Sequence, residues 1–477
     1  MNKFIKMFFI IAILTSDVSI LNAQTITWQK IFGGPLTEVG RYGIQTYDGS
    51  YIILNSVSGS TNGGPYLLCL DQYGNQIWNK IIDTSSTCTC IQQTKDSGFI
   101  ISGSKNNNGL LIKTDRSGNV IWKRYFSPNN YITLFTKVRV TETGNFIICG
   151  FASFFPTKAF VLKTDSLGNL MWQNFLIYGG NADAEDLTTD NKGNIYFTGG
   201  ITVNNFIKTL FAKLNSEGEF IWFNYYGSEG NGDAQGGYSI VSESSRELFL
   251  AGVYKNSSST KAHFTKIDSS GKVIFQNILP QTFSAEDMCR TLTGNYAIAG
   301  GGGSDSPDIL FILLNNKGDI LTRKLFNSNG DESDSPSSIV ETSENGFLIT
   351  GSTSFIPTNF GGNLNIYVIK TDSIGNATPV SIKNISSDIP LTFKLYQNYP
   401  NPFNPNTKIK FDLVESGVVK IEIFYNTGKK IITLLNERKN QGTYELRFEG
   451  ANLSSGIYYY KMTSKNYSFT KKMLLLK

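Results

Sequence analysis

The stretch GLLIKTDRSGNVIWKRYF, residues 109–126, contains the pattern that decides the fold. Its apolar first half predicts a buried strand, and its second half, which carries Trp122, predicts another strand. Between them, Asp115 can bond its side chain to nearby backbone, and Gly118 can take the positive φ of a tight turn. The segment therefore predicts a β-hairpin.

The same turn recurs at intervals of about 50 residues, as in a repeat protein. Its copies begin at Asp71, Asp115, Asp165, Asn215, Asp268, Asn315 and Asp372. The strand after the turn has its key position at Trp78, Trp122, Trp172, Trp222, Phe275 and Leu321. Another strand ends at Gly103, Gly150, Gly199, Gly252, Gly300 and Gly351, with Asn55 in the first copy. With a polar-alternating strand before it, each unit is expected to have four strands, and the glycine column indicates a place where side chains would collide.

The number of strands predicts how the units assemble. The middle strands are apolar on both faces, so each small sheet needs cover on two sides, which radial stacking provides. The last turn has no aromatic strand after it, but TWQKIFGG at residues 27–34 supplies such a strand at the amino end. The sequence therefore predicts an all-β chain with a seven-bladed β-propeller over residues 24–376, closed by an N-terminal strand.

The first 23 residues have a different composition. Lys3 and Lys6 precede the apolar run MFFIIAIL at residues 7–14, and small or polar residues follow as far as Ala23. This run is too short for a stable bilayer anchor, so we expect a cleaved signal peptide over residues 1–23, with a membrane-tethered amino terminus as the alternative. No later stretch predicts an integral membrane segment, and the mature protein is expected to be soluble or surface-attached.

Charge and cysteine content exclude some classes of protein. The net charge of +5 comes from basic residues spread along the chain, so nucleic-acid binding is not implied. The cysteines are odd in number and include no CxxC, which argues against a disulfide framework and favours buried thiols. Cys88 and Cys90 could start a metal site, but further soft ligands are missing. The five cysteines are Cys69, Cys88, Cys90, Cys149 and Cys289.

A second, smaller domain is expected at the carboxyl end. Residues 377–390 are short and polar, with Pro379 and Pro390, as is typical of a linker. Alternating strands and hairpin turns follow, with the motif Asn426-Thr-Gly428 at one turn. Residues 391–477 are therefore expected to form a small β-sandwich of immunoglobulin-like type.

These carboxyl-terminal segments resemble the type A sorting domain of the type IX secretion system. The matching pieces are YPNPFNPNT, the strand GVVKIEI, the Asn-Thr-Gly turn, LSSGIYYY and the terminal FTKKMLLLK. The resemblance implies export to the surface of a Gram-negative bacterium, contact with the type IX machinery through residues 391–477, and cleavage near the linker before anchoring or release. A generic carbohydrate-binding or immunoglobulin-like module is the alternative. The sorting-motif residues are Tyr399, Pro400, Asn401, Pro402, Phe403, Gly428, Gly456, Lys471 and Lys472.

Carboxylates gather in the connections between one unit and the next. In a propeller these connections lie on one face, some of them near the central channel. Such groups fit a site for a cation or a polar ligand, or a carboxylate pair that acts on a glycosidic bond; solvated residues that cap turns are the alternative. The candidate ligand-binding residues are Glu38, Asp183, Glu185, Asp186, Asp233, Glu286, Asp287 and Asp334.

Residues at two other aligned positions of the repeat have structural explanations. The only histidine, His263, falls in an apolar column and is expected to be packed, so a His-based zinc site is not available. A lysine column fits either a basic ring for an anionic ligand or stems packed on the sheet with ammonium groups near acids at the rim; we expect the second. These lysines are Lys113, Lys163, Lys213, Lys266 and Lys370.

No catalytic residue, metal site or cofactor is predicted. We expect a non-enzymatic binding or adhesion protein that takes a polysaccharide or a surface protein as its ligand. An extracellular glycan-active hydrolase or lyase that uses the acidic connections is one alternative, and a structural surface-coat protein is another. Convergence of Glu185, Asp186, Glu286 and Asp287 would favour the hydrolase or lyase.

Overall fold

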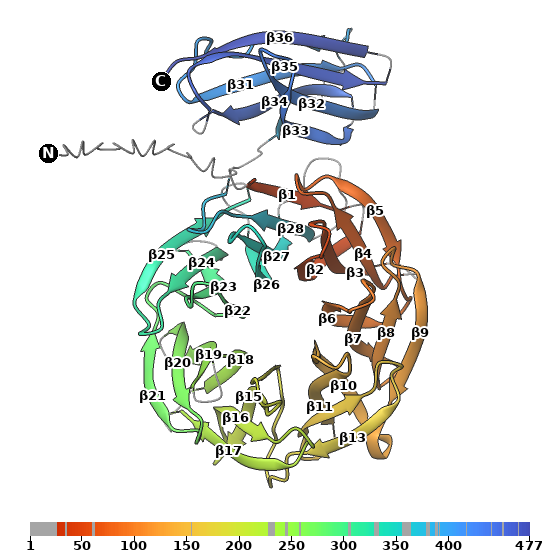
Figure 1. Cartoon of the computed structure of the whole chain (residues 1–477), viewed down its shortest axis with the longest axis vertical. Helices are drawn as coiled ribbons and strands as arrows, with labels where there is room; N and C mark the ends of the chain where they lie inside the picture. Colours follow the sequence, from red (N-terminus) through yellow and green to blue (C-terminus); the bar gives the residue numbers. More distant parts are fainter. Residues whose placement is uncertain are drawn as a thin grey trace, which may run out of the picture.

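The computed structural model shows an all-β chain of four-stranded antiparallel sheets, consistent with a propeller-like fold (Figure 1). Its one helical element among the described residues is the short 3-10 helix η1 (Pro128–Asn130). The described part of the chain contains no helix long and apolar enough to cross a membrane. The structure describes residues 26–33, 36–59, 63–153, 155–227, 234–243, 247–256, 259–303, 307–328, 333–354, 364–377, 382–386, 390, 392–415, 417–439, 441–450, 453–465 and 467–477.

The body contains seven four-stranded sheets within the described residues. The first three sheets consist of β2 (Thr37–Gln45), β3 (Tyr51–Ser58), β4 (Pro65–Leu70) and β5 (Gln76–Ile81); β6 (Thr87–Gln93), β7 (Phe99–Lys105), β8 (Asn108–Thr114) and β9 (Val120–Phe126); and β10 (Ile132–Val140), β11 (Phe146–Ser153), β12 (Lys158–Thr164) and β13 (Leu170–Phe175). The next three consist of β14 (Asp186–Thr189), β15 (Ile195–Val203), β16 (Phe206–Leu214) and β17 (Phe220–Tyr226); β18 (Ala234–Ser242), β19 (Glu247–Lys255), β20 (Thr260–Asp268) and β21 (Val273–Ile278); and β22 (Asp287–Arg290), β23 (Tyr296–Gly302), β24 (Asp308–Leu314) and β25 (Ile320–Phe326). In each of these six sheets, the first strand lies toward the centre of the ring and the fourth lies at its circumference (Figure 1).

The last sheet of the body takes its outer strand from the amino end of the chain. It has the order β1-β28-β27-β26, with β1 (Trp28–Phe32), β26 (Asp334–Glu341), β27 (Phe347–Thr353) and β28 (Asn365–Lys370). Strand β1 runs antiparallel to β28, with Trp28 opposite Lys370 and Phe32 opposite Ile366. The aromatic strand that the last unit lacks in sequence is therefore supplied by residues 28–32.

The turn glycines are contact points between neighbouring sheets. Gly168 has a φ of +80°, and a Cβ placed on it would lie 2.8 Å from the indole of Trp122 in the preceding sheet. The same relation joins Gly118 to Trp78 and Gly218 to Trp172. Trp28 of the last sheet covers Gly74 of the first sheet, and its Nε1 donates to the Gln72 carbonyl at 3.0 Å. The repeated aromatic-on-glycine contact therefore also joins the two ends of the repeat.

The sixth sheet departs from the predicted aromatic column. Leu321 was expected in this column, but the register places Thr322 opposite Leu313, where Trp122 stands opposite Lys113 in the second sheet. Leu321 is 51% exposed instead. The turn glycine of the next sheet, Gly375, is covered by Phe311 of β24. The prediction for Leu321 was therefore wrong, and an aromatic residue on the adjacent strand provides the contact.

The glycine column on the second strand of each sheet has the steric cause that the sequence indicated. A Cβ on Gly103 would overlap the Thr87 carbonyl oxygen, and one on Gly150 would overlap that of Leu134. In both sheets the innermost strand shifts register at this point, between Cys88 and Cys90 in β6 and between Phe135 and Lys137 in β10. The shift is a β-bulge, which presses the backbone of the innermost strand against the glycine.

The carboxyl-terminal residues form two further sheets around one hydrophobic core. The sheets have the orders β29-β34-β31-β30 and β33-β32-β35-β36, and Ile409, Tyr444, Ile421 and Tyr460 are among the buried residues that they share. Strand β29 lies inside the segment 377–390 that was expected to be a linker, and it pairs with β34. The strands are β29 (Ile382–Ser386), β30 (Lys394–Leu395), β31 (Asn406–Leu413), β32 (Gly417–Tyr425), β33 (Lys430–Lys439), β34 (Gly442–Glu449), β35 (Gly456–Ser464) and β36 (Tyr467–Leu475).

Candidate functional site

One buried position recurs on the innermost strand of every sheet of the body. It is the first residue after the bulge, or the first residue of the strand in β14 and β22, and it pairs with the residue before the column glycine or Asn55. We call this set the axial column. Its members are Tyr42, Cys90, Lys137, Asp186, Ser239, Asp287 and Ser338.

The axial column joins neighbouring sheets by hydrogen bonds. Four of its side chains accept a backbone N–H of the innermost strand in the next sheet, at distances between 3.0 and 3.1 Å. The bonds run from Ile240 N to Asp186, from Met288 N to Ser239, from Ile339 N to Asp287 and from Gly43 N to Ser338. The last of these connects β26 with β2, strands from opposite ends of the repeat.

Lys137 is the cation at the centre of the axial column. Its Nζ lies 3.2 Å from Asp287 Oδ1 and 3.6 Å from Asp186 Oδ1, and it lies over the Tyr42 ring at 4.8 Å from the centroid. Burial opposes the charge on Lys137, but the two carboxylates outweigh it and raise the Lys137 pKa well above its ordinary value. Arg139 adds a second ion pair, 3.1 Å from Asp186 Oδ1. The negative charges of Asp186 and Asp287 are thus compensated by buried cations, and both carboxylates also accept backbone hydrogen bonds.

Glu185 and Glu286 each precede an axial-column residue, and their carboxylates have different surroundings. They stand where Thr89 and Thr136 stand in the second and third sheets. Each threonine hydroxyl donates to a carbonyl of the next sheet, Thr89 to Phe135 at 3.0 Å and Thr136 to Ala184 at 2.7 Å. An ionised carboxylate has no proton to donate, so it cannot form this bond. Neither Glu185 nor Glu286 makes an ion pair with the described residues.

Three carboxylates and a phenol influence one another at this position. Burial, then the charge of Asp183, raises the pKa of Glu185 to about 7, and Asp186 and Glu286 act in the same direction. Burial also raises the pKa of Glu286 and of Asp183. Tyr238 has its pKa raised by burial, and then by Glu286, Glu185 and Asp183. We call Asp183, Glu185, Tyr238 and Glu286 the acidic group; it is half-buried beside the axial column.

The remaining candidate carboxylates are not part of the acidic group. Glu38 accepts a hydrogen bond from the Tyr66 hydroxyl, and burial raises its pKa. Asp334 accepts bonds from the Ser328 N–H at 2.7 Å and the Ser328 hydroxyl at 2.8 Å, and burial raises its pKa as well. Glu38 thus makes a contact within its own sheet, and Asp334 of β26 contacts the residues that follow β25 of the sixth sheet. Asp233 lies outside the described residues.

Sequence reasoning missed the cationic and hydroxyl members of this arrangement. Lys137, Arg139 and Ser239 were not among the candidate residues. An alignment of the seven innermost strands at the bulge would have placed Lys137, Asp186 and Asp287 in one column. The sequence spacing alone did not separate the ion-paired Asp186 and Asp287 from the half-buried Glu185 and Glu286, which make no ion pair with the described residues.

The histidine and lysine columns behave as expected. His263 is fully buried, with Nδ1 3.1 Å from Thr265 Oγ1 and Nε2 3.3 Å from the Gly236 carbonyl, and burial lowers its pKa to about 4. Lys113 and Lys266 each pair with an acid at 2.9 Å, Asp96 and Glu247 respectively. Lys370 lies 3.8 Å from Glu344, and Lys213 lies over the Tyr196 ring. Four of the five lysines therefore lie beside acids or aromatic rings of their own sheets.

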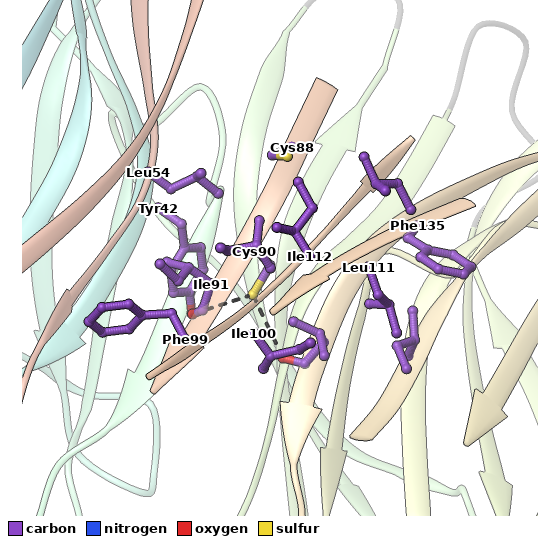
Figure 2. Packing of buried hydrophobic residues seen from close by; sticks show 14 of the residues in the cluster. Tyr42, Leu54, Cys88, Cys90, Ile91, Phe99, Ile100, Leu111, Ile112 and Phe135 are labelled. Atoms are coloured by element: carbon purple, nitrogen blue, oxygen red, sulfur yellow. Dashed lines mark hydrogen bonds between the residues drawn. The ribbon is translucent and has the colours of Figure 1, made fainter. Parts of the chain in front are cut away.

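The cysteines are free thiols, and four of the five are buried. Cys88 and Cys90 lie among apolar side chains of the core between the first three sheets, with Tyr42, Ile91 and Ile100 nearby (Figure 2). Burial raises the Cys90 pKa, which disfavours the thiolate that a metal ligand requires. Within the described ranges, no group of three or more His, Cys, Asp or Glu side chains is placed to hold a metal ion.

The sorting-motif residues pack on the carboxyl-terminal sheets. Tyr399 exchanges backbone hydrogen bonds with Lys408 of β31 at 2.9 Å, and the buried Phe403 donates its N–H to Leu474 of β36 at 2.9 Å. Gly428 has a φ of +80° in the hairpin between β32 and β33. Lys471 and Lys472 are exposed on β36, and Gly456 begins β35. The YPNPF segment thus links β31 to the final strand.

Comparison with known proteins identifies the carboxyl-terminal domain. Residues 397–476 match the family of secretion system C-terminal sorting domains. This match supports a secreted protein that the type IX system exports to the cell surface or the extracellular space, and it implies contact with that machinery.

The chain is also similar to solved structures with which it shares little sequence. A protein of unknown function from Dyadobacter fermentans is 9% identical, with a TM-score of 0.45, and the match covers 73% of this chain and 99% of that one. Drosophila Plexin A, solved in complex with Semaphorin 1b, is 7% identical, with a TM-score of 0.40, and the match covers 73% of this chain and 87% of that one. No curated protein matches the chain significantly.

Proposed function

We propose that residues 24–376 form a seven-bladed β-propeller closed by β1, and that residues 391–477 form an immunoglobulin-like sandwich. Support for closure comes from two contacts that repeat around the ring and also join its ends: Trp28 on Gly74, and the Ser338 hydroxyl with the Gly43 N–H. A signal peptide over residues 1–23, which lie outside the described part of the chain, would carry the protein through the inner membrane.

The body is a non-enzymatic binding module, and the acidic group is its ligand site. The observation that carries this proposal is that adjacent carboxylates differ in whether a cation is paired with them. The charges of Asp186 and Asp287 are compensated by Lys137 and Arg139, whereas Glu185 and Glu286 make no ion pair with the described residues, in a half-buried place where the second and third sheets have threonine. Raised pKa values show that these carboxylates cost stability, which a binding role would explain. We expect a ligand that donates hydrogen bonds to these carboxylates, through the hydroxyl groups of a polysaccharide or the basic side chains of a surface protein.

The test measures binding and product release together. The exported chain is titrated with a panel of polysaccharides, and Glu185→Gln and Glu286→Gln are compared with Glu142→Gln, which makes the same charge change at an exposed carboxylate in the turn between β10 and β11. Saturable binding that only the first two variants weaken, without cleavage, supports the proposal. Binding that all three variants leave unchanged contradicts the site.

An extracellular glycan hydrolase is the second candidate, and one observation favours it. Glu185, with its pKa raised to about 7 by burial and by Asp183, is protonated to a large extent near neutral pH, as a general acid must be. A glycosidase would use Glu286 as the partner carboxylate. Release of reducing ends in the same titration, lost in both Gln variants, would establish this reading over simple binding.

A further inference from the structure

A pocket of about 640 Å³ lies at the circumference of the body, between the fourth and fifth sheets, away from the acidic group. Its volume is in the range of small-ligand sites. The walls come from the end of β17, from β19 and β20, and from the outer strand β21. The lining residues are Tyr226, Gly227, Tyr254, Asn256, Ser259, Lys261, Gln276 and Ile278.

The equivalent position of the second sheet is filled by an ion cluster. There the Lys105 and Lys123 ammonium groups lie 2.9 and 2.6 Å from the carboxylate of Asp83. The repeat fixes the correspondence, because Lys105 and Tyr254 each follow the column glycine by two residues, and Lys123 and Gln276 each follow the key aromatic residue. Asp83 and Gly227 each come five residues after the preceding Trp. In the fifth sheet these three charged residues are replaced by Tyr, Gln and Gly, so the residues that line the pocket cannot form the same ion cluster.

The replacement leaves polar groups in need of partners. The Gln276 amide nitrogen is buried and has no hydrogen-bond partner among the described residues, a condition that costs free energy until an acceptor arrives. Its counterpart in the sixth sheet, Arg323, donates to the Gln281 carbonyl at 2.6 Å. Lys261 is exposed at the edge of the pocket and makes no ion pair with any described residue. Both groups are donors, so a ligand that pairs with them presents acceptor oxygens.

We propose that this pocket binds a saccharide that carries a carboxylate, such as a uronic acid unit of an extracellular glycan. The rings of Tyr226 and Tyr254 offer apolar bodies with polar tips, which suit the mixed C–H and hydroxyl surface of a sugar. Gln276 donates to a ring or hydroxyl oxygen, and Lys261 pairs with the carboxylate. The proposal stands apart from the acidic group, whose carboxylates would repel the same ligand.

The test uses calorimetric titration of the full exported chain with oligogalacturonate and oligomannuronate, and with neutral xylohexaose. Tyr254→Ala and Gln276→Ala are expected to weaken uronate binding about tenfold each, from the lost ring contact and the lost donor. Lys261→Met is expected to remove the preference for uronate over xylohexaose. The matched control is Gln173→Ala, which changes the same repeat position in the third sheet and does not line this pocket.

A variant whose pocket is filled by side chains can distinguish a loss of ligand binding from a loss of folding. Combining Gly227→Asp, Tyr254→Lys and Gln276→Lys installs the ion cluster of the second sheet, so this variant is expected to keep the parent melting temperature and lose uronate binding. Glu185→Gln leaves uronate affinity within about twofold of the parent, which distinguishes this site from the acidic group. Undetectable uronate binding at millimolar ligand, or parent affinity in both Tyr254→Ala and Gln276→Ala, would overturn the proposal.

Discussion

Glu185 links the stability of the protein to pH. Its pKa is raised to about 7 in the folded state by burial and by Asp183, against 4.5 for the ordinary carboxyl. The folded state therefore holds a proton that the unfolded state releases, and stability from this group is full below pH 4.5 and is lost as pH rises through 7. Glu185→Gln, which mimics the protonated form, is expected to raise the free energy of unfolding by about 1–3 kcal/mol at pH 8.

Urea denaturation at pH 8 and pH 4.5 measures the effect. The gain from Glu185→Gln should shrink to near zero at pH 4.5, where the parent carboxyl is already neutral. An equal gain at both pH values would mean that the effect is packing, not ionisation, and would contradict the assignment.

Lys137 has the opposite role, because its charge is required. Lys137→Met leaves the carboxylates of Asp186 and Asp287 buried with less compensation, which is expected to cost about 3–5 kcal/mol of stability at pH 7. Lys317→Met, on an exposed outer turn, removes the same charge as a control and should change stability by less than about 0.5 kcal/mol. Equal denaturation midpoints for the two variants would refute a central role for Lys137.

The sequence analysis named Glu185 and Asp186 alike as candidate ligand-binding residues and did not distinguish their surroundings. Glu185 and Asp186 are adjacent, so any pattern that finds one finds the other. Their surroundings differ because Asp186 is buried at the start of β14 beside Lys137 and Arg139, whereas Glu185 lies just before the strand and is half-buried. Lys137, the partner of Asp186, is about 50 residues away in sequence. The two residues come into contact because the third and fourth sheets of the body lie side by side.

At the scale of the element, the turn glycines meet two requirements that can be separated. Gly168 and Gly144 have nearly the same φ, +80° and +84°, but a Cβ would meet the Trp122 indole at 2.8 Å only at Gly168, and nothing within 4 Å at Gly144. Gly144→Ala is expected to cost about 1 kcal/mol for backbone strain. Gly168→Ala is expected to cost about 1–3 kcal/mol more, because the indole must move.

Thermal unfolding of both variants tests this comparison, with a Trp122→Ala background as the control. Removing the indole should bring the cost of Gly168→Ala down to that of Gly144→Ala. If the two glycines are equally sensitive in the parent, the aromatic-on-glycine contact does not hold neighbouring sheets together.

The sequence predicted the strands better than their exact registers. The turn residues Asp or Asn and Gly define the hairpins locally, so the first six turns form hairpins where the pattern put them, and the turn at Asp372 forms without a following strand to pair with β28. Leu321 was assigned by its apolar character, whereas the spacing after Asp319 points to Thr322, as it does for Trp122 after Asn119. Strand β29 was missed because IKNIS is short and pairs with a strand about 60 residues later, a contact without local signal.

At the scale of the whole molecule, β1 decides whether the repeat is a ring or an open array. The two contacts that join the ends, Trp28 on Gly74 and Ser338 with Gly43, have equivalents at other junctions between sheets. Each sheet thus depends on both neighbours, and an open edge would expose one face of the first and last sheets. Repeat proteins that end this way need a cap to stay soluble.

Deleting residues 26–33 from the full chain is expected to remove most of the cooperativity of unfolding, because β28 loses its partner and Gly74 loses the Trp28 indole. A synthetic peptide TWQKIFGG, added in excess, should restore part of the melting temperature by occupying the vacant edge, in proportion to its concentration. The same peptide with Trp28→Ala should restore less.

Deleting residues 391–477 serves as the control for lost length and should leave the melting temperature of the body unchanged. If the truncation lacking β1 unfolds at the parent temperature, the ring is not closed by this strand, and the inter-sheet contacts of Trp28 contribute little to holding the body together.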